Sequence, residues 1–117
     1  MATLSKVKSL CKSLPGATVD IKWGADQVYS VGGKMFAVLC EVGKDAPTVS
    51  FKVEDERFLE LTDREGFAPA PYLARAHWVA VRDLRKVGDA ELKALVTRSY
   101  ALVAARLPRS KRAQLAV

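Results

Sequence analysis

Basic residues stand beside aromatic residues at several points of the sequence, a combination that can bind nucleic acid. The residues concerned are Lys22 with Trp23, Lys34, Lys52, Arg75, and His77 with Trp78. Lysine and arginine neutralise phosphates, while an aromatic ring on an open sheet can stack on a base or wedge into a groove. The alternative is that both tryptophans are core residues and that the lysines are solvated or protect the edges of a sheet.

The motifs favour binding over catalysis. His77 is the only histidine, so a histidine-dependent triad or metal site would have a single imidazole. No Gly-x-Ser-x-Gly, His-Glu-x-x-His or Walker-type loop is present, and Val31-Gly-Gly-Lys34 lacks the Ser/Thr and the following helix of a phosphate cradle. Cys11 and Cys40 stand in apolar patterns without metal-type spacing, which indicates reduced core thiols. We therefore expect no enzyme, no metal and no cofactor.

Length and composition fit one globular domain. The chain has 117 residues, of which 50% are apolar and 27% charged, and its formal net charge is +6. Four basic residues and no acidic residue follow position 105, so the rest of the chain carries a net charge of only +2. Such an excess permits binding to nucleic acid or to an acidic surface without establishing it. No signal-like start and no run near the ~18 apolar residues of a membrane span are present, which predicts a cytoplasmic protein.

Four consecutive segments have the pattern of strands. They are residues 18–23, 27–31, 35–40 and 48–53. In the first, Val19, Ile21 and Trp23 alternate with polar residues, which predicts one buried face. Gly32-Gly33 supplies the positive φ angles of a tight hairpin, and the strand 35–40 is apolar on both faces, with 35, 37 and 39 opposite 36, 38 and 40, as a central strand would be. A polar turn at 43–47 leads to the fourth strand.

Three segments have the pattern of helices. Residues 2–14 form an amphipathic helix that ends at Pro15, and a second helix starts at 54, buries Phe58, Leu59 and Leu61, and ends near position 66. Two prolines make 67–72 an extended crossing segment, after which 77–82 is a strand. The last helix has Asp89 as its N-cap and stops at position 108.

The order helix, four strands, helix, strand, helix predicts an α+β fold with a mostly antiparallel sheet. The terminal helices cover one face, and the other face stays partly open. Residues 1–108 form the domain, and 109–117 form a basic, frayed tail. Lys22, Lys52, Thr48 and Ser50 occupy the polar phase of their strands and are expected to share the solvent-facing side.

Motifs along nearly the whole chain resemble those of the bacterial MmcQ/YjbR family. They are Leu14-Pro15-Gly16-Ala17, Lys22-Trp23-Gly24, Val31-Gly32-Gly33-Lys34-Met35-Phe36-Ala37, Ser50-Phe51-Lys52, Tyr72, His77-Trp78, Ser99-Tyr100 and Leu107-Pro108. The resemblance implies a CyaY-like, frataxin-like fold and the family's expected role in DNA binding, with the sheet and loops as a double wing. The first helix carries lysines and no carboxylate, unlike the acidic ridge of frataxin-like iron binders, so iron binding is not expected here.

The residues that match the family pattern form the predicted site. They are Lys22, Trp23, Lys34, Lys52, Tyr72, Arg75, His77 and Trp78, which Arg82, Arg85, Lys86 and the tail residues Arg109, Lys111 and Arg112 extend. The expected ligand is double-stranded DNA, bound through its backbone by a monomer with little sequence preference. Two alternatives remain: a protein-interaction module that uses the same face, and a small-anion site formed by Lys22, Lys52, Arg75 and His77.

Overall fold

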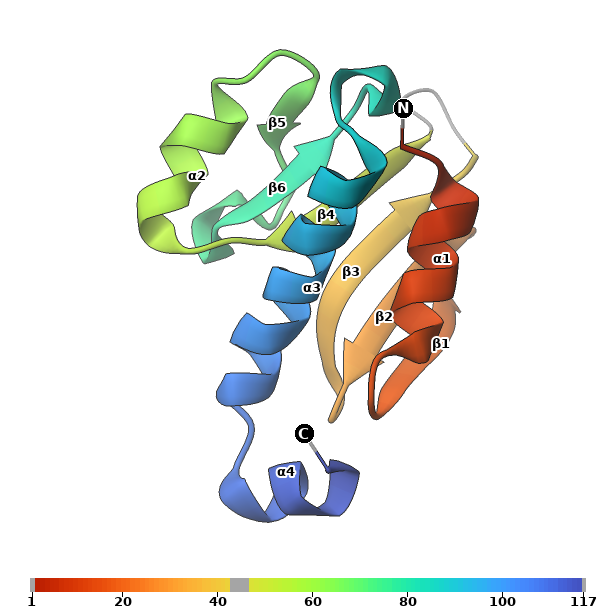
Figure 1. Cartoon of the computed structure of the whole chain (residues 1–117), viewed down its shortest axis with the longest axis vertical. Helices are drawn as coiled ribbons and strands as arrows, with labels where there is room; N and C mark the ends of the chain where they lie inside the picture. The colour runs from red at the N-terminus through yellow and green to blue at the C-terminus, as the bar shows by residue number, and fades with distance from the viewer. Residues whose placement is uncertain (1, 43–46, 117) are drawn as a thin grey trace.

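A six-stranded antiparallel sheet forms the centre of the fold (Figure 1). The computed structural model describes residues 2–42 and 47–116. The strands are β1 (Ala17–Lys22), β2 (Asp26–Val31), β3 (Lys34–Cys40), β4 (Thr48–Lys52), β5 (Phe67–Pro69) and β6 (Trp78–Val81). Their order is β1-β2-β3-β4-β6-β5, and each neighbouring pair is antiparallel. The predicted α+β class and antiparallel sheet are confirmed. Of the predicted turn at 43–47, positions 43–46 lie outside the described residues.

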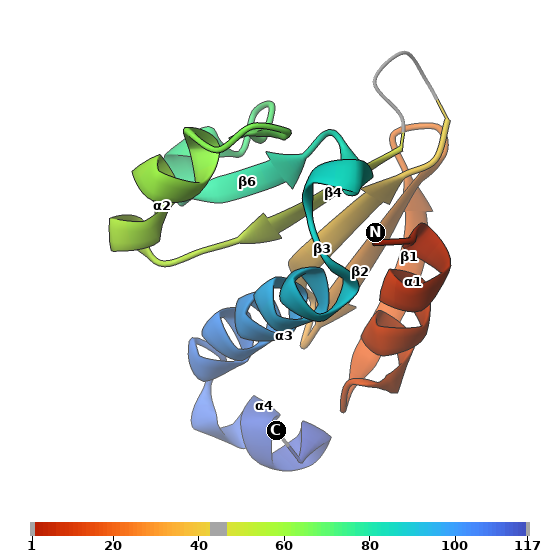
Figure 2. The ribbon, with the colours of Figure 1, turned by 45° about the horizontal axis from the view of Figure 1, so that its top comes forward.

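The helices pack mainly on one face of this sheet. They are α1 (Leu4–Ser13), α2 (Asp55–Thr62), α3 (Asp89–Ala105) and α4 (Arg109–Leu115), with the short 3-10 helices η1 (Ala74–Ala76) and η2 (Leu84–Lys86). Helix α3 crosses β3 and β4, and α1 lies beside it over the β1 side of the sheet (Figure 2). No helix of the described residues is long and apolar enough to cross a membrane.

The main core lies between the helices and the sheet. Tyr29, Phe36 and Phe51 of the sheet are fully buried there, and Leu92 and Val96 of α3 pack in the same cluster. Removing a side chain of this size from water stabilises a fold by about 1.5–3 kcal/mol. This burial explains why the strands with β-branched and aromatic runs were predictable from sequence.

A smaller apolar cluster lies on the other face of the sheet. Val28 of β2, Val38 of β3, and Trp78 and Ala80 of β6 form this cluster, and Ala70 covers it from the loop that follows β5. The backbone N–H of Ala70 donates to the carbonyl of Trp78 at 3.0 Å, which holds the loop over the sheet. The open face is therefore covered at its β6 end and uncovered toward β1.

Two predictions about side-chain direction are wrong. The apolar residues of the first strand segment, Val19, Ile21 and Trp23, are exposed, and the side chain of Ile21 is 63% exposed. The reason is that β1 is an edge strand whose apolar side chains α1 leaves largely uncovered. In β3, the register with β2 shifts between Tyr29 and Ser30, so the alternation breaks and Phe36 lies in the main core together with its neighbour at position 37. The predicted central position of this strand is confirmed.

Several boundaries also differ from the predictions. The segment after Gly66 begins with β5, whose proline is tolerated because β5 is at the sheet edge. Leu59 of α2 is 76% exposed instead of buried, and α2 ends at Thr62. The N-cap of α3 is Gly88, while Asp89 pairs with Lys6.

The C-terminal segment is ordered in the described part of the chain. The prediction of a frayed tail is wrong for Arg109–Leu115, which forms α4. Leu115 packs against the main core. It also lies close to Gly16, since a Cβ atom placed on Gly16 would be 3.3 Å from the Leu115 side chain. This contact places α4 at the end of the sheet where β1 begins.

Candidate functional site

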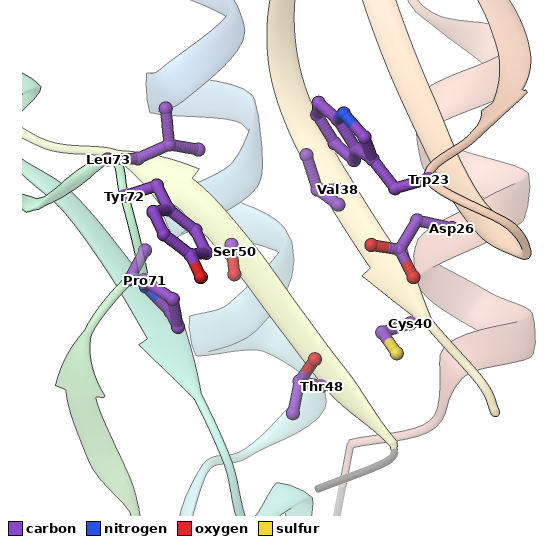
Figure 3. A pocket seen from close by; sticks show the side chains of 10 residues that line it. Trp23, Asp26, Val38, Cys40, Thr48, Ser50, Pro71, Tyr72 and Leu73 are labelled. Atoms are coloured by element: carbon purple, nitrogen blue, oxygen red, sulfur yellow. The ribbon is translucent and has the colours of Figure 1, made fainter. Parts of the chain in front are cut away.

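A groove with a volume of about 570 Å³ lies on the face of the sheet opposite α1 and α3 (Figure 3). Its lining consists of Trp23, Asp26, Val38, Cys40, Thr48, Ser50, Ala70, Pro71, Tyr72 and Leu73. Apolar groups dominate this lining, and none of its described residues is a lysine or arginine. Grooves of this size with a few polar groups are typical binding sites for small molecules or for single units of a polymer.

The strand register builds the floor of the groove. Val38 of β3 pairs with Ser50 of β4, and Cys40 pairs with Thr48, so these four side chains form two adjacent rows on one face. Two hydroxyl groups therefore lie next to an apolar side chain and a thiol. The alternation of β4 predicted that Thr48 and Ser50 share the open face, and the structure confirms this.

Two aromatic side chains form opposite walls of the groove. Trp23 comes from the β1–β2 turn and Tyr72 from the loop after β5, with Ser50 and Val38 between them (Figure 3). Trp23 is 64% exposed and Tyr72 is fully exposed. Both have left-handed backbones, with φ of 49° and 65°, a conformation that bulky residues rarely adopt and that costs about 1–3 kcal/mol. The left-handed turn takes Trp23 out of the β1 alternation and over the groove.

Asp26 and Cys40 form the polar corner of the groove. Burial and, after it, the neighbouring Asp26 carboxylate raise the pKa of the Cys40 thiol. The thiol donates a hydrogen bond to the carbonyl of Val42 at 3.0 Å. Cys11 and Cys40 are both free cysteines, the first buried and the second half-buried. Within the described ranges, no group of three or more His, Cys, Asp or Glu side chains is placed to hold a metal ion.

Cations collect where β4 ends, next to the groove. The Nζ of Lys52 donates to the carbonyl of Ala76 at 2.6 Å, which ties the end of β4 to η1 and brings Arg75 of η1 into the same region. Burial and, to a smaller degree, Arg106 lower the pKa of Lys52, whereas Asp55 acts in the opposite direction. The electrostatic effect of Arg106 shows that the end of α3 also lies near Lys52.

The β2–β3 hairpin and α4 extend this group of cations. The Nζ of Lys111 donates to the carbonyl of Gly32 at 3.1 Å, and a Cβ on Gly32 would touch Leu107. Lys34 follows directly in the hairpin. We call the resulting set the basic rim; its members are Lys34, Lys52, Arg75, Arg106, Arg109, Lys111 and Arg112.

The basic rim differs from most other cations of the described chain in its pairing. Within residues 2–42 and 47–116, no rim side chain forms an ion pair with a carboxylate. The ion pairs of other cations are Lys6–Asp89, Lys8–Glu41, Arg57–Glu60, Arg64–Glu91, Arg85–Asp83, Lys86–Glu65 and Arg98–Glu54. The rim cations are therefore not neutralised by direct ion pairs in the described chain, although Asp55 acts on Lys52 at longer range.

Sequence comparison agrees with this fold. The sequence model of the YjbR family matches residues 12–102. The chain belongs to the YjbR family. A crystal structure of a Deinococcus radiodurans protein with a DUF419 domain is similar to this YjbR chain, with a TM-score of 0.87 and 28% identity over 100% of this chain and 90% of that one. A Pseudomonas syringae protein shares the fold at 20% identity, with a TM-score of 0.69 over 86% of this chain and 98% of that one. No curated protein matches the chain.

The structure of this YjbR domain brings together five of the eight predicted site residues. Trp23 and Tyr72 are the walls of the groove, and Lys34, Lys52 and Arg75 belong to the basic rim. The groove and the rim adjoin each other, because Ser50 and Lys52 are two positions apart on the same face of β4.

The other three predicted residues belong neither to the groove lining nor to the basic rim. Lys22 shares the open face and pairs with Asp26 beside the groove, but its place in the sheet puts it roughly 20 Å from Lys52, given three strand spacings and four residues along a strand. The Nδ1 of His77 contacts Asp55 at 2.7 Å, and its ring packs edge-on against Phe58. Trp78 is 4% exposed beneath the loop that covers β6.

Two charged residues of the site, Asp26 and Arg106, were not predicted from the sequence of this YjbR chain. Asp26 carries no pattern that distinguishes it from a turn aspartate, and its place in the groove depends on pairing between β2 and β3. Arg106 contributed only to the charge of the C-terminal region, because the sequence does not show that α3 ends beside Lys52. The position of Pro108 after the helix was the one signal that fixed this end of α3.

Proposed function

We propose that this YjbR domain is a non-enzymatic DNA-binding domain that holds the phosphate backbone at its basic rim. The observation that carries the proposal is the pairing of charges: the rim cations have no carboxylate partners in the described chain, while most cations elsewhere do. When lysine and arginine side chains neutralise phosphates, the counterions condensed on the DNA are released, which provides the main free energy of binding in the absence of base contacts.

The arrangement of the rim supports contact with several phosphates at once. Its members come from the β2–β3 hairpin, the end of β4, η1, the end of α3 and α4, which the contacts of Lys52 and Lys111 hold together. Rim residues on rigid elements lose less conformational entropy on binding than residues of a frayed tail would. Such contacts position DNA without reading its sequence, so little sequence preference is expected.

Catalysis is not part of the proposed role. The single imidazole, His77, is engaged by Asp55 and Phe58, and it does not line the groove. Burial and the neighbouring Asp26 carboxylate raise the pKa of the Cys40 thiol, which disfavours the thiolate that a nucleophile would need. Binding is therefore the function that these side chains support best.

The test is a titration of a labelled random-sequence duplex, followed by fluorescence anisotropy at several salt concentrations. Lys34→Ala/Arg106→Ala removes two exposed rim cations, and we expect weaker binding and a log–log salt slope that falls by about two. Lys93→Ala is a matched control because Lys93 is also exposed and lies at the opposite end of α3 from Arg106. It should leave the slope nearly unchanged.

A second control separates DNA binding from attraction to any acidic surface. Poly-glutamate of similar length carries negative charge without phosphate, and it should bind more weakly than the duplex at equal charge. Equal affinity for both polymers, or no binding of the duplex at low salt, would refute the proposal. Salt-independent binding to another protein would instead support the interaction-module alternative.

A further inference from the structure

The groove and the basic rim form one continuous surface along β4. Thr48 and Ser50 line the groove, and Lys52 lies next on the same face, with about 7 Å between alternate residues of a strand. The same loop supplies Tyr72 to the groove and leads into η1 with Arg75. A ligand that has both a planar group and a phosphate within one nucleotide length can therefore contact both features at once.

We propose that the groove takes an unpaired nucleobase between Trp23 and Tyr72, so that single-stranded nucleic acid is the preferred ligand of this domain. The inference rests on the proposed function and names the form of nucleic acid that the site accepts. Stacking of a base on an aromatic ring is worth about 1–3 kcal/mol and tolerates any sequence, because every base has two π faces.

The charge distribution of the groove supports a base and excludes a phosphate. Among the residues that the structure describes, the lining has one carboxylate, Asp26, and no lysine or arginine, so these residues offer a phosphate no cationic partner inside the groove. The uncharged edge of a base finds hydrogen-bond partners there instead, namely the hydroxyls of Thr48 and Ser50 and the carboxylate of Asp26. The phosphates of the same strand remain outside, next to Lys52 and Arg75.

The geometry of duplex DNA explains why an unpaired base is required. In a duplex, each base face is covered by the neighbouring base pairs, so two aromatic side chains on opposite walls cannot reach it. Trp23 and Tyr72 stand on opposite walls of the groove and are both exposed, as an intercalated base would require (Figure 3). Duplex binding at the rim alone would leave both rings unused.

The experiment compares two single strands that differ only in their bases. One is a fluorescein-labelled ten-nucleotide deoxycytidine oligomer, and the other is an abasic oligomer with the same number of phosphates. We expect the wild-type domain to bind the first at least about tenfold more tightly, measured by anisotropy. Trp23→Ala and Tyr72→Ala should each remove most of this difference and leave the affinity for the abasic oligomer unchanged.

Leu59→Ala is the matched control, because Leu59 is another large exposed side chain and lies on α2 outside the groove. It should behave as the wild type does. Intrinsic fluorescence gives a second readout: Trp23 is exposed while Trp78 is buried, so stacking should quench Trp23 with the cytidine oligomer and not with the abasic one. Trp23→Phe should abolish the quenching and keep most of the affinity.

The outcomes separate this inference from the proposed function. Equal affinity for the two oligomers, or a base preference that survives Trp23→Ala and Tyr72→Ala, overturns the single-strand inference while DNA binding at the rim stands. Loss of binding to both oligomers in Lys34→Ala/Arg106→Ala supports the rim. Absence of binding to either oligomer by the wild-type protein at low salt overturns both.

Discussion

The hydroxyl of Ser99 donates a hydrogen bond to the carbonyl of Phe36 at 2.6 Å, inside the main core. The same hydroxyl accepts a hydrogen bond from the backbone N–H of Lys52 at 2.9 Å. Phe36 lies at the β-bulge of β3 and Lys52 at the end of β4, where the regular ladder between these strands stops. Ser99 thus joins α3 to both strands and fixes the point at which β4 enters the basic rim.

Ser99→Ala should destabilise the fold by about 2–4 kcal/mol. The substitution leaves a buried donor and a buried acceptor without a partner, and each costs about 1–3 kcal/mol. Urea unfolding followed by circular dichroism measures the change. Ser9→Ala is the control, because Ser9 is exposed on α1, and it should change stability by less than about 0.5 kcal/mol. If Ser99→Ala lowered the free energy of unfolding as little as the control does, water would have replaced the hydroxyl.

The hairpin at Gly32-Gly33 and the helices with strong periodicity were predictable, because their signals are local. Both glycines have positive φ, as the two-residue turn requires. The burial of strand side chains does not follow from local sequence. Because β1 is an edge strand, Ile21 is exposed although it belongs to the apolar side of the alternation. Alternation gives the two faces of a strand, whereas the order of the strands decides which face is covered.

The site was predictable only in part for a related reason. Trp23 and Trp78 have similar sequence surroundings, each after a basic residue, yet one is exposed at a left-handed turn and the other lies under a loop. The difference depends on the loop after β5, which returns over β6, and no periodicity encodes that return. Likewise, Arg106 and Lys52 are 54 positions apart and come together only because α3 crosses the sheet.

The close approach of Gly32 to Leu107, in the link between α3 and α4, gives a second prediction. A Cβ at Gly32 would lie 2.7 Å from a methyl group of Leu107, whereas a Cβ at Gly33 would have no neighbour within 4 Å. Both residues have positive φ, so alanine at either position costs about 1–2 kcal/mol of strain. Gly32→Ala should cost about 1–3 kcal/mol more than Gly33→Ala in urea unfolding, because Leu107 must move. Equal losses of stability in the two variants would mean that Leu107 can move aside at little cost in free energy.

The two thiols should differ in reactivity. Burial raises the pKa of Cys11 to about 12, and burial together with Asp26 raises the pKa of the half-buried Cys40. The thiolate is the reactive form, so at pH 8 an aromatic disulfide reagent should label Cys40 slowly and Cys11 only after unfolding. Labelling of Cys40 should accelerate as the pH rises toward its raised pKa. Cys40→Ser should abolish labelling of the folded protein, and persistent labelling would contradict this order.

Glu91 should contribute stability that depends on pH. Arg64 donates two hydrogen bonds to its carboxylate, at 2.6 and 2.7 Å, and lowers its pKa from the ordinary 4.5. A pKa that is lower in the folded state gives stability that is present above about pH 4.5 and is lost as the pH falls through the lowered value. Glu91→Gln should therefore have a lower free energy of unfolding than the wild type at pH 7, and this difference should narrow in acid.

Urea unfolding of Glu91→Gln at pH 7, 4 and 3 measures this gap. Asp20→Asn removes an exposed carboxylate of β1 that has no ion pair in the described chain, and it should show little gap at any of these values. A gap for Glu91→Gln that stayed constant with pH would show that the effect is packing and not charge.

Asp26 should decide which bases the groove prefers. Its carboxylate only accepts hydrogen bonds, so it favours the amino group of cytosine and repels the carbonyl that thymine presents at the same position. A deoxycytidine oligomer should bind at least about fivefold more tightly than a deoxythymidine oligomer, since a hydrogen bond to a charged group is worth about 1.5–3 kcal/mol before losses to solvent. Asp26→Asn presents both a donor and an acceptor, so it should bring the two affinities together by strengthening the binding of thymidine.

The same variant reports on the fold of the groove independently of any ligand. Because Asp26 raises the pKa of Cys40, Asp26→Asn should speed the labelling of Cys40 at pH 8. Faster labelling with an unchanged ratio of cytidine to thymidine affinity would show that Asp26 stands beside the thiol but does not contact a base. Faster labelling together with a reduced ratio would place the base edge at Asp26, between the two aromatic walls, with its phosphates directed along β4 toward Lys52.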